Sequence, residues 1–390
     1  MIYLDNAATS WPKPQAVYEE LGSFLRQAGA NPGRASHRMA SRAAWTVGET
    51  RRKLARLLNV DDPRRIVFAA NATDALNLAI KGILAPGDHA VTTVMEHNSV
   101  RRPLRALERI GVTTSTVPAD AEGFVQPGDI RSALRPNTRL VVVTHASNVN
   151  GALQPIPEIA EIVHAHGALL LVDGAQTVGS IPLDSASLGA DLLAFPGHKG
   201  LMGPPGTGGL FIGGRVDTAR LRSVREGGTG GNSGEDVQPA ELPDRYEAGT
   251  VNTVGIAALG AALDFILHNG VEAIGAHERA LTTRLIEGLR AIDGVRVFAP
   301  REPRQRVAVV SLTVDGWEPA DFGVALDEAF GIACRTGLHC APGACRALGV
   351  GPQGTIRMSP GFFTTVEEID QAIEAISELA GASLTVVREA

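Results

Sequence analysis

A lysine and an aspartate each follow an apolar run that has the length of a buried strand. Asp173 ends the run Leu169–Val172, and Lys199 comes shortly after the run Asp191–Phe195. In α/β folds, the carboxyl ends of neighbouring strands gather ligand chemistry at one edge of the sheet. A lysine taken alone is more often a surface residue after an ordinary strand. The pair, however, is what pyridoxal phosphate (PLP) requires, because the lysine forms the Schiff base and the carboxylate keeps the pyridine nitrogen protonated.

Further short segments accompany this pair along the chain. They are Tyr3–Thr9, Asn71–Ala75, Glu96–Ser99, Ser147–Asn148, Asp173–Gln176, Gly197–Lys199, Glu247–Thr250, Arg335–Ala341 and Ile356–Ser359. In content and order they resemble class V aminotransferase-fold enzymes, and within that family the cysteine desulfurases and selenocysteine lyases with a short loop around the catalytic cysteine. The resemblance implies an α/β, PLP-dependent transferase fold of type I, with a mostly parallel sheet in a large domain and a smaller α+β C-terminal domain.

The pattern of apolar residues agrees with that fold, since strand-like runs alternate with amphipathic helical stretches. We expect strands at residues 66–70, 89–94, 139–145, 168–172, 191–195 and 209–212, and helices at residues 73–84, 102–110 and 156–166. A helix from about residue 256, a strand at 307–314, a helix at 320–330 and a closing helix at 366–380 follow. We therefore place the large PLP-binding domain at residues 14–255. The small domain, with the cysteine loop, spans residues 256–390, and residues 1–13 pack nearby.

The phosphate of the cofactor needs hydrogen-bond donors, and the N-terminus of a helix supplies them. We expect Ala72 and Thr73, where a strand gives way to a helix, to bind the phosphate, and Thr73 is also a candidate N-cap. Two Gly-rich stretches, 203–209 and 227–234, lack the ending of a P-loop. We expect the first stretch to form a turn after Lys199 and the second to form a loop near the entrance of the active site. The resemblance implies two further phosphate ligands: His198, and Thr250 reaching the phosphate of a partner subunit, which implies a homodimer.

The resemblance also assigns side chains to the cofactor ring. His97 is implied to stack on the pyridine ring and to help proton transfer, which makes it a catalytic residue beside Lys199. Gln176 is implied to contact the phenolic oxygen. Asn148 reaches either that oxygen or the substrate carboxylate, although its segment, residues 147–151, is also a good turn sequence.

Two arginines are candidates for substrate binding. Arg357 suits an amino-acid carboxylate, because a planar guanidinium makes two parallel charge-assisted hydrogen bonds. Most arginines lie at the surface, and the family position is what favours the functional role for Arg357. Arg335 is a second candidate of the same kind.

The three cysteines differ in their surroundings. Cys334 ends an apolar segment, which predicts a core residue. Cys340 lies near Arg335 and His339, a polar and partly cationic setting that favours the thiolate, and the resemblance makes it the catalytic nucleophile. Cys345 has no counterpart in the motif. Metal binding by His339, Cys340 and Cys345 is a minor alternative, because the paired Cys-x-x-Cys arms of a structural zinc site are missing. We predict no metal.

Composition limits the class of protein. A chain of 390 residues, 44% hydrophobic and 20% charged, is long enough for two domains and is globular. Its formal net charge of -6 argues against nucleic acid or an anionic membrane as the main partner. No run approaches the ~18 apolar residues of a transmembrane helix, and the N-terminus lacks the pattern of a signal peptide. An odd number of cysteines without regular spacing predicts the reducing cytoplasm.

These observations predict a PLP-dependent cysteine desulfurase that converts L-cysteine to L-alanine and holds the sulfur as a persulfide on Cys340, for transfer to a sulfur-acceptor protein. A selenocysteine lyase or related C–S lyase is the alternative enzyme, and a non-catalytic docking protein for a sulfur carrier is the alternative of another class. Leu338 stands where many relatives have a second histidine, and Thr364–Thr365 stands where they have an Asn-Thr pair. These departures bear on substrate choice and persulfide handling.

Overall fold

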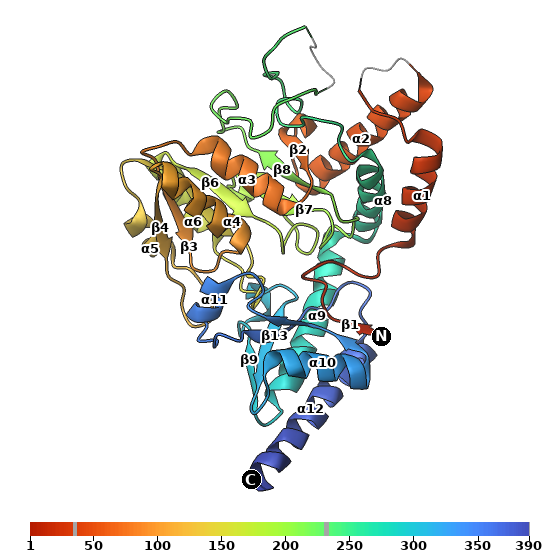
Figure 1. The fold of residues 1–390 in the computed structure, drawn as a ribbon, viewed down its shortest axis with the longest axis vertical. Coiled ribbons are helices and arrows are strands. Elements are labelled where there is room, and N and C mark those ends of the chain that lie inside the picture. The colour runs from red at the N-terminus through yellow and green to blue at the C-terminus, as the bar shows by residue number, and fades with distance from the viewer. Residues whose placement is uncertain (34–36, 230–233, 390) are drawn as a thin grey trace.

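The computed structural model describes residues 1–33, 37–229 and 234–389, with side chains up to residue 381. The loop expected at 227–234 therefore lies partly outside the described residues. A larger sheet has the strand order β2-β8-β7-β6-β5-β3-β4, and a smaller sheet has the order β12-β13-β10-β9. The larger sheet lies in the upper half of the view and the smaller one below it (Figure 1).

The larger sheet is parallel except for one strand. Its strands are β2 (Ile66–Ala69), β3 (His89–Thr93), β4 (Thr113–Val117), β5 (Thr138–Thr144), β6 (Leu169–Asp173), β7 (Leu192–Pro196) and β8 (Gly208–Ile212). β8 runs antiparallel to both of its neighbours, β2 and β7, whereas the pairs formed by β3, β4, β5, β6 and β7 are parallel. The prediction of an α/β fold with a mostly parallel sheet is confirmed.

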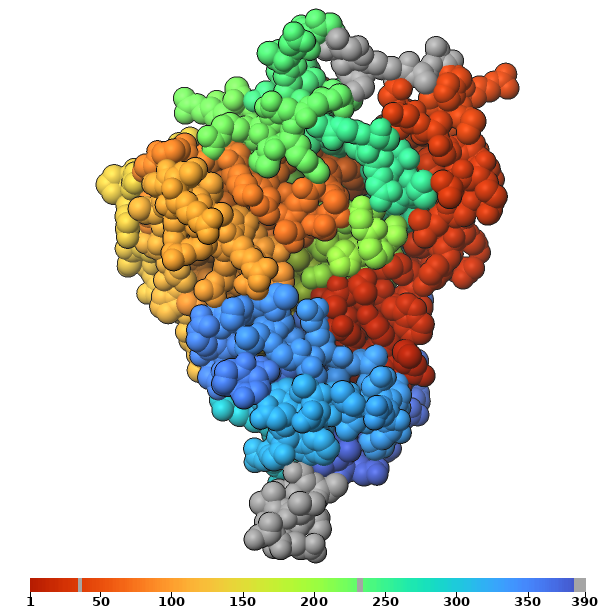
Figure 2. Space-filling model, viewed as in Figure 1, coloured from red at the N-terminus to blue at the C-terminus, as the bar shows by residue number. Residues whose placement is uncertain are grey.

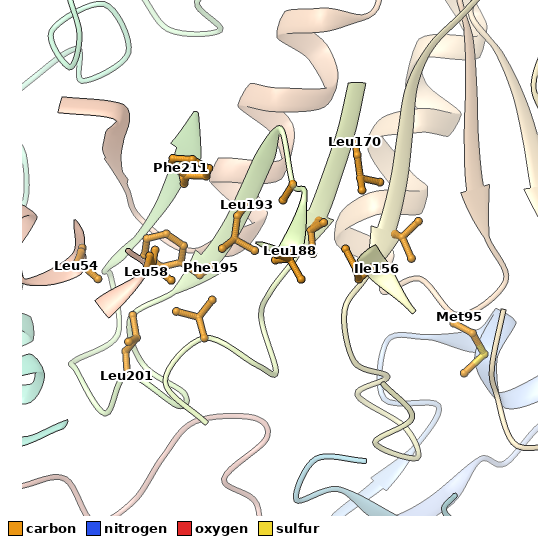
Figure 3. Packing of buried hydrophobic residues seen from close by; sticks show 14 of the residues in the cluster. Leu54, Leu58, Met95, Ile156, Leu170, Leu188, Leu193, Phe195, Leu201 and Phe211 are labelled. Carbon is orange, nitrogen blue, oxygen red and sulfur yellow. The ribbon is translucent and has the colours of Figure 1, made fainter. Parts of the chain in front are cut away.

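Helices cover both faces of this sheet. Leu140 and Val142 of β5 belong to a core shared with α3 (Ala72–Ile83) and α4 (Asn98–Leu107). Val141 and Val143 point the other way, into a core shared with α2 (Arg38–Leu57), α5 (Pro127–Ala133), α6 (Ile156–His166) and α8 (Thr253–Asn269). Figure 3 shows part of this second core, including Phe195 of β7. Because both faces are buried, the central strands β5, β6 and β7 contain continuous apolar runs rather than alternating ones.

The smaller sheet is antiparallel and has its own core. Its strands are β9 (Val295–Phe298), β10 (Val310–Val314), β12 (Arg335–Gly337) and β13 (Thr355–Met358). Apolar side chains of α9 (Val271–Arg290), α10 (Pro319–Phe330) and α12 (Val366–Glu389) pack against it. The remaining elements are α1 (Gln15–Ala28), α7 (Ser185–Leu188) and α11 (Pro342–Ala347).

The two cores meet close to the predicted domain boundary. α8 contributes Leu259 and Leu263 to the core of the larger sheet, whereas α9 contributes Leu281 and Leu285 to that of the smaller sheet. The division at residue 256 stays a prediction, and the side chains of α8 associate with the larger sheet. Among the described residues, no single helix combines the length and apolar composition of a membrane span; only α8 and α9 taken together, with an 82° bend between them, meet those criteria.

The N-terminal segment bridges the two sheets. β1 (Ile2–Tyr3) pairs in parallel with β11 (Ile332–Ala333) beside the smaller sheet. A few residues later, the backbone N–H of Ser10 donates to the carbonyl of His198 at 2.9 Å. His198 directly precedes Lys199, at the edge of the larger sheet. Figure 2 shows the red N-terminal segment against the blue C-terminal part of the molecule. The segment is therefore placed to bring residues 3–10 to the boundary between the sheets.

Candidate active site

Strand register places Asp173 and the Lys199 turn at the same sheet edge. Asp173, the last residue of β6, pairs with Ala194 of β7, which ends two residues later at Pro196. Gly197 follows, and a Cβ atom there would clash with Thr207 Oγ1, so only glycine fits. The chain therefore passes close to Thr207 immediately before His198 and Lys199.

A cavity of about 290 Å³ lies at these strand ends. Its lining contains almost all of the predicted cofactor and substrate residues: Ala72, Thr73, His97, Asn148, Asp173, Gln176, His198, Lys199, Arg335 and Arg357. Cys340 and Thr250 do not belong to this lining. Ser99 and Thr144 do, although sequence reasoning did not single them out. The fold thus gathers segments from both sheets around Lys199.

The central pair of charges is buried and has few partners. Burial raises the pKa of Asp173, against the opposing effects of a hydrogen bond from Ala175 and the charge of Lys199. Within the described part of the chain, that bond from Ala175 N, 3.0 Å long, is the one hydrogen bond that its carboxylate accepts. Burial lowers the pKa of Lys199 to about 8, with Asp173 opposing the shift. The neutral, nucleophilic form of Lys199 is therefore a minority near pH 7, but it is far more populated than in an ordinary lysine.

His97 is held in one orientation. It caps α4, because its Nδ1 accepts from Ser99 N at 3.1 Å, and the same nitrogen lies 2.8 Å from Ser99 Oγ. Ser99 Oγ in turn lies 2.7 Å from Thr73 Oγ1. Burial and the charge of Lys199 lower the pKa of His97 to about 4, so the ring is neutral. Since Nδ1 accepts, the proton of the neutral ring sits on Nε2.

The part of the cavity that we expect to bind the cofactor phosphate offers hydrogen-bond donors. The N-cap of α3 is Asn71, whose side chain accepts from Asp74 N at 2.9 Å, so the alternative role of Thr73 as N-cap is wrong. Ala72 and Thr73 occupy the first turn, where backbone N–H groups have no intrahelical partner. His198 Nδ1 is buried without a partner among the described residues, and burial lowers the pKa of its ring to about 4. Free N–H groups at a helix N-terminus suit an anion.

Arg357 stands on the central strand β13 of the smaller sheet and is fixed from two sides. Its Nη2 donates to Asp5 Oδ1 at 2.6 Å, and its Nη1 donates to the backbone oxygen of Asn148 at 3.1 Å. Strand pairing places Arg335 directly beside it. Asp5 was missed as a functional residue, although it lies in the N-terminal motif. The two hydrogen bonds of Arg357 fix its guanidinium at the wall of the cavity, and its Nε has no partner among the described residues.

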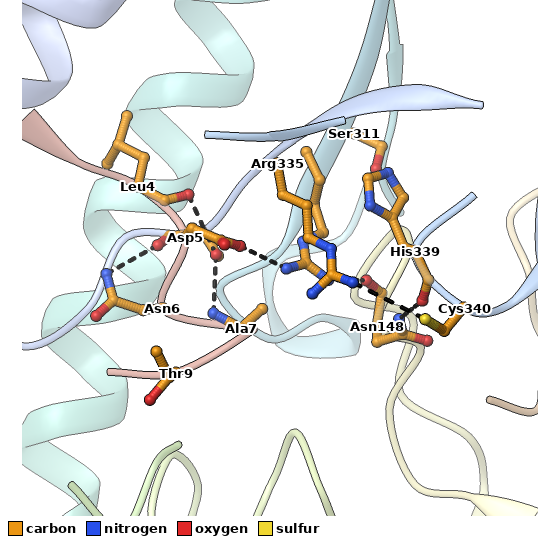
Figure 4. A network of polar contacts seen from close by, with 12 residues as sticks. Leu4, Asp5, Asn6, Ala7, Thr9, Asn148, Ser311, Arg335, His339 and Cys340 are labelled. Carbon is orange, nitrogen blue, oxygen red and sulfur yellow. Dashed lines mark hydrogen bonds and ion pairs between the residues drawn. The ribbon is translucent and has the colours of Figure 1, made fainter. Parts of the chain in front are cut away.

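The Cys340 loop is tied to the cavity by its backbone. Asn148 Nδ2 donates to the carbonyl of His339 at 2.7 Å, and Asn98 N donates to the carbonyl of Cys340 at 2.8 Å. His339 and Cys340 have φ angles of 49° and 59°, a left-handed conformation that costs non-glycine residues energy and needs such support. Cys340 itself is exposed, and Arg335 Nη2 lies 3.8 Å from its Sγ (Figure 4).

His339 does not add to the cationic setting expected around Cys340. Its Nε2 lies 2.8 Å from Thr355 Oγ1, and burial together with Arg357 and Arg335 lowers its pKa to about 3, so the ring is neutral. The positive charge next to Cys340 comes from Arg335. The expectation that both residues provide positive charge is therefore wrong for His339.

The other two cysteines have different surroundings. Cys345 is buried, its Sγ lies 3.6 Å from the carbonyl of Leu338, and burial raises its pKa to about 11. Burial likewise raises the pKa of Cys334 to about 12. All three cysteines are free thiols. Within the described ranges, no group of three or more His, Cys, Asp or Glu side chains is arranged to hold a metal ion.

Thr250 lies apart from Lys199 within one chain. It lines a separate cavity of about 600 Å³ and accepts a hydrogen bond from Asn31 Nδ2 at 3.1 Å. Glu247, from the same motif, forms an ion pair with Arg51 at 2.6 Å and accepts from Phe68 N at 2.6 Å. The motif at 247–250 thus fixes the chain beside β2, and Thr250 is exposed at its end.

The two departures from the family pattern have local structural roles. Leu338 packs against the main core. Thr365 and Glu368 form a capping box at the start of α12: Thr365 Oγ1 accepts from Glu368 N at 3.2 Å, and Glu368 Oε2 accepts from Thr365 N at 2.9 Å. Thr364 holds the preceding turn, because its Oγ1 accepts from Gly361 N at 3.0 Å.

The chain is similar to known proteins over nearly its full length. Residues 2–372 match the class V aminotransferase family. A probable cysteine desulfurase from Methanothermobacter thermautotrophicus is 37% identical over 97% of this chain and 95% of the relative. A probable cysteine desulfurase from Mycolicibacterium paratuberculosis is 36% identical, and the match spans 55% of that longer protein. The apo structure of a cysteine desulfurase from Thermococcus onnurineus NA1 superposes with a TM-score of 0.90 at 33% identity, covering 98% of this chain and 95% of that one.

Fold and site together define the class: an α/β protein with a lysine and a buried aspartate at one edge of a mostly parallel sheet, facing arginines of a smaller sheet. The chain belongs to the class V aminotransferase family. The resemblance inferred from its motifs is confirmed.

Proposed function

We propose that the protein is a PLP-dependent cysteine desulfurase. One observation carries the proposal: a single cavity brings together Lys199, Asp173 and Arg357, and Arg335 links its wall to the exposed thiol of Cys340. The named activity of the relatives at 32–37% identity supports the same assignment. A non-catalytic docking protein would not need a low-pKa lysine beside a buried carboxylate.

The residues present fit PLP. Among the described residues, the buried Asp173 has no charged partner in contact and suits a protonated ring nitrogen. The first turn of α3 and His198 Nδ1, which has no partner in the same part of the chain, suit the phosphate. His97 would cover the ring face, Gln176 or Asn148 would face the phenolic oxygen, and Thr250 would serve the partner subunit's cofactor. When bound, PLP supplies an electron sink for the bond that breaks at the substrate Cα.

The chain's own residues account for the remaining chemistry. Arg357, with Arg335 beside it, binds the carboxylate of L-cysteine. The Lys199 amine takes the proton from Cα and returns a proton to carbon later. Cys340 Sγ attacks the substrate sulfur, so an S–S bond forms and the Cβ–S bond breaks, with its electron pair going to Cβ. Protonation then yields L-alanine and a persulfide on Cys340, and atoms balance without an external oxidant.

A substrate panel tests this proposal. We expect the purified protein with PLP to form alanine from L-cysteine, and a persulfide to accumulate when no sulfur acceptor is added. L-selenocysteine, cystine and cysteine sulfinate are compared under the same conditions, with alanine, sulfide and pyruvate all measured. Alanine from L-selenocysteine alone would establish the alternative, a selenocysteine lyase. Pyruvate in place of alanine would establish a different C–S lyase and contradict the desulfurase assignment.

The proposal includes a homodimer located in the cytoplasm that hands its sulfur to an acceptor protein. Thr250 is exposed and lies outside the Lys199 cavity of its own chain, as a residue that serves a partner subunit would. We therefore expect light scattering at micromolar concentration to give twice the chain mass of 40.8 kDa. A fully active monomer would contradict this part of the proposal.

A further inference from the structure

A second cavity shares Lys199 with the candidate cofactor cavity. Ala7, Gln176 and Lys199 line both cavities. Gln176 Nε2 donates to the carbonyl of Ala7 at 3.1 Å, so these residues form the partition between them. The second cavity, which we call the Glu278 cavity, has a volume of about 40 Å³. Since one water needs roughly 10–15 Å³ on this measure, about three waters fit.

The lining of the Glu278 cavity combines apolar and polar side chains. Met202, Val307, Val309, Phe362 and Phe363 form much of its wall. Phe362 and Phe363 stand edge to face, with ring centroids 5.2 Å apart. Against this wall, Asn6, Ser10, Lys199 and Glu278 supply the polar groups that waters in such a cavity need.

Glu278 is the unexpected member of this lining. It lies on α9 and is 8% exposed. In the part of the chain that the structure describes, no hydrogen bond or ion pair of its carboxyl group is found. Its carboxyl oxygens are not sealed in the protein but reach the space of the cavity, where water can solvate them. No side chain or backbone group of the described residues holds the acid in place.

We propose that the Glu278 cavity is a proton reservoir, in which Glu278 exchanges a proton with the Lys199 amine through water in the cavity. Glu278 touches neither substrate nor cofactor and acts through Lys199. The inference rests on the proposed function, because it assigns a source and a destination for the proton that Lys199 carries.

Glu278 and Lys199 have similar pKa values. Burial raises the pKa of Glu278 to about 8, opposed by Arg279 on the same helix, and burial lowers the pKa of Lys199 to about 8. The other charged or titratable groups nearby point elsewhere: His277 Nε2 lies 3.0 Å from the carbonyl of Thr364, and Lys13 Nζ donates to the carbonyl of Ser10 at 2.9 Å. Transfer between groups of equal pKa costs little free energy in either direction.

The step is a simple proton transfer. The O–H bond of the Glu278 carboxylic acid breaks, water passes the proton, and an N–H bond forms at Lys199 Nζ; no electrons are transferred. The reverse transfer restores both groups before the next turnover. Lys199 can then be neutral when it takes the proton from Cα and charged when it must deliver one.

The test is the exchange of the Cα proton of L-alanine in D₂O, followed by NMR with the holoenzyme. This exchange needs Lys199 and PLP but not sulfur transfer, so it separates this inference from the desulfurase assignment. We expect Glu278→Gln to slow deuterium uptake about tenfold, with unchanged PLP content and unchanged KM for L-alanine. The difference should shrink above pH 8, where Glu278 has lost its proton. Glu272→Gln, an exposed acid on the same helix, is the matched control and should behave as the wild type.

Thermal unfolding of the apoenzyme supplies an independent readout. The folded-state pKa of Glu278 is raised from 4.5 to about 8. Between these values the unfolded chain has released the proton and the folded chain retains it, so this residue's contribution to stability falls as pH rises. The Tm of Glu278→Gln minus the Tm of the wild type should therefore increase from pH 5 to pH 8.

Three results would overturn the proposal: wild-type exchange rates in Glu278→Gln, no exchange in the wild type, or slower exchange that merely follows lost PLP or a Tm lowered at every pH. Exchange that responds as expected in an enzyme that forms no alanine from L-cysteine would leave the reservoir standing and remove the desulfurase assignment.

Discussion

Lys199→Ala is expected to lose the visible absorption of lysine-bound PLP and to reduce turnover by about 10³-fold or more, because the same amine holds the cofactor and moves the proton at Cα. Its position beside Asp173 and its pKa of about 8 make it the nucleophile that PLP requires. Absorbance of the purified variant after incubation with PLP, and alanine formation from L-cysteine, are the two measurements.

Lys13 is the matched control for this experiment. Burial also lowers the pKa of Lys13 to about 8, but its Nζ donates to the carbonyl and hydroxyl of Ser10 and does not line the cofactor cavity. Lys13→Ala should therefore keep the absorption band. If the band moved with Lys13 and survived in Lys199→Ala, the assignment of the cofactor lysine would be wrong.

The elements that the sequence predicts best are those buried on both sides. Residues 140–143 of β5 and 169–172 of β6 pack into one core or the other, so each strand contains an unbroken apolar run. The expected strands at 139–145 and 168–172 match them within one or two residues. α2 was not anticipated, because its many arginines mask the stripe formed by Val47, Leu54 and Ala55.

Short strands at the joint between the two sheets escape sequence reasoning for another reason. β12 spans Arg335–Gly337 and is nowhere fully buried, so it has no apolar pattern to read. It exists because β13 pairs with it, in a register that places Arg335 beside Arg357. Long-range pairing of this kind is fixed by tertiary structure rather than by local preference.

The candidate site divides in the same way. Lys199 and Asp173 come at the ends of predicted strands, so the sequence alone could place them. The roles of Asp5, Ser99 and Glu278 depend on their tertiary contacts, which the local sequence does not reveal. Asp5 contacts a residue 352 positions away. Contacts over such separations leave no spacing signal in the chain, and the N-terminal motif was the one indication that Asp5 has a role.

Cys340→Ser is expected to abolish alanine formation from L-cysteine, a loss of several orders of magnitude, while PLP stays bound. The hydroxyl cannot replace the thiolate as the group that takes up sulfur. Cys340 is the exposed cysteine, its sulfur lies 3.8 Å from Arg335 Nη2, and two hydrogen bonds hold the carbonyls of its loop. Cys345→Ser is the matched control, because Cys345 is buried and burial raises its pKa to about 11.

The position of the sulfur decides between the two cysteines, since Cys345 lies only five residues further along the chain, in α11. Mass spectrometry of the enzyme treated with L-cysteine should find the additional sulfur on Cys340 in the wild type and in Cys345→Ser. A persulfide on Cys345 alone, or full alanine formation by Cys340→Ser, would contradict the assignment.

Cleavage of L-selenocysteine is a second test of the same variant. Selenium leaves carbon more easily than sulfur does, so this cleavage should depend less on the thiol. A Cys340→Ser variant that still cleaves L-selenocysteine would show that the cofactor site is intact and that the lost step is sulfur uptake.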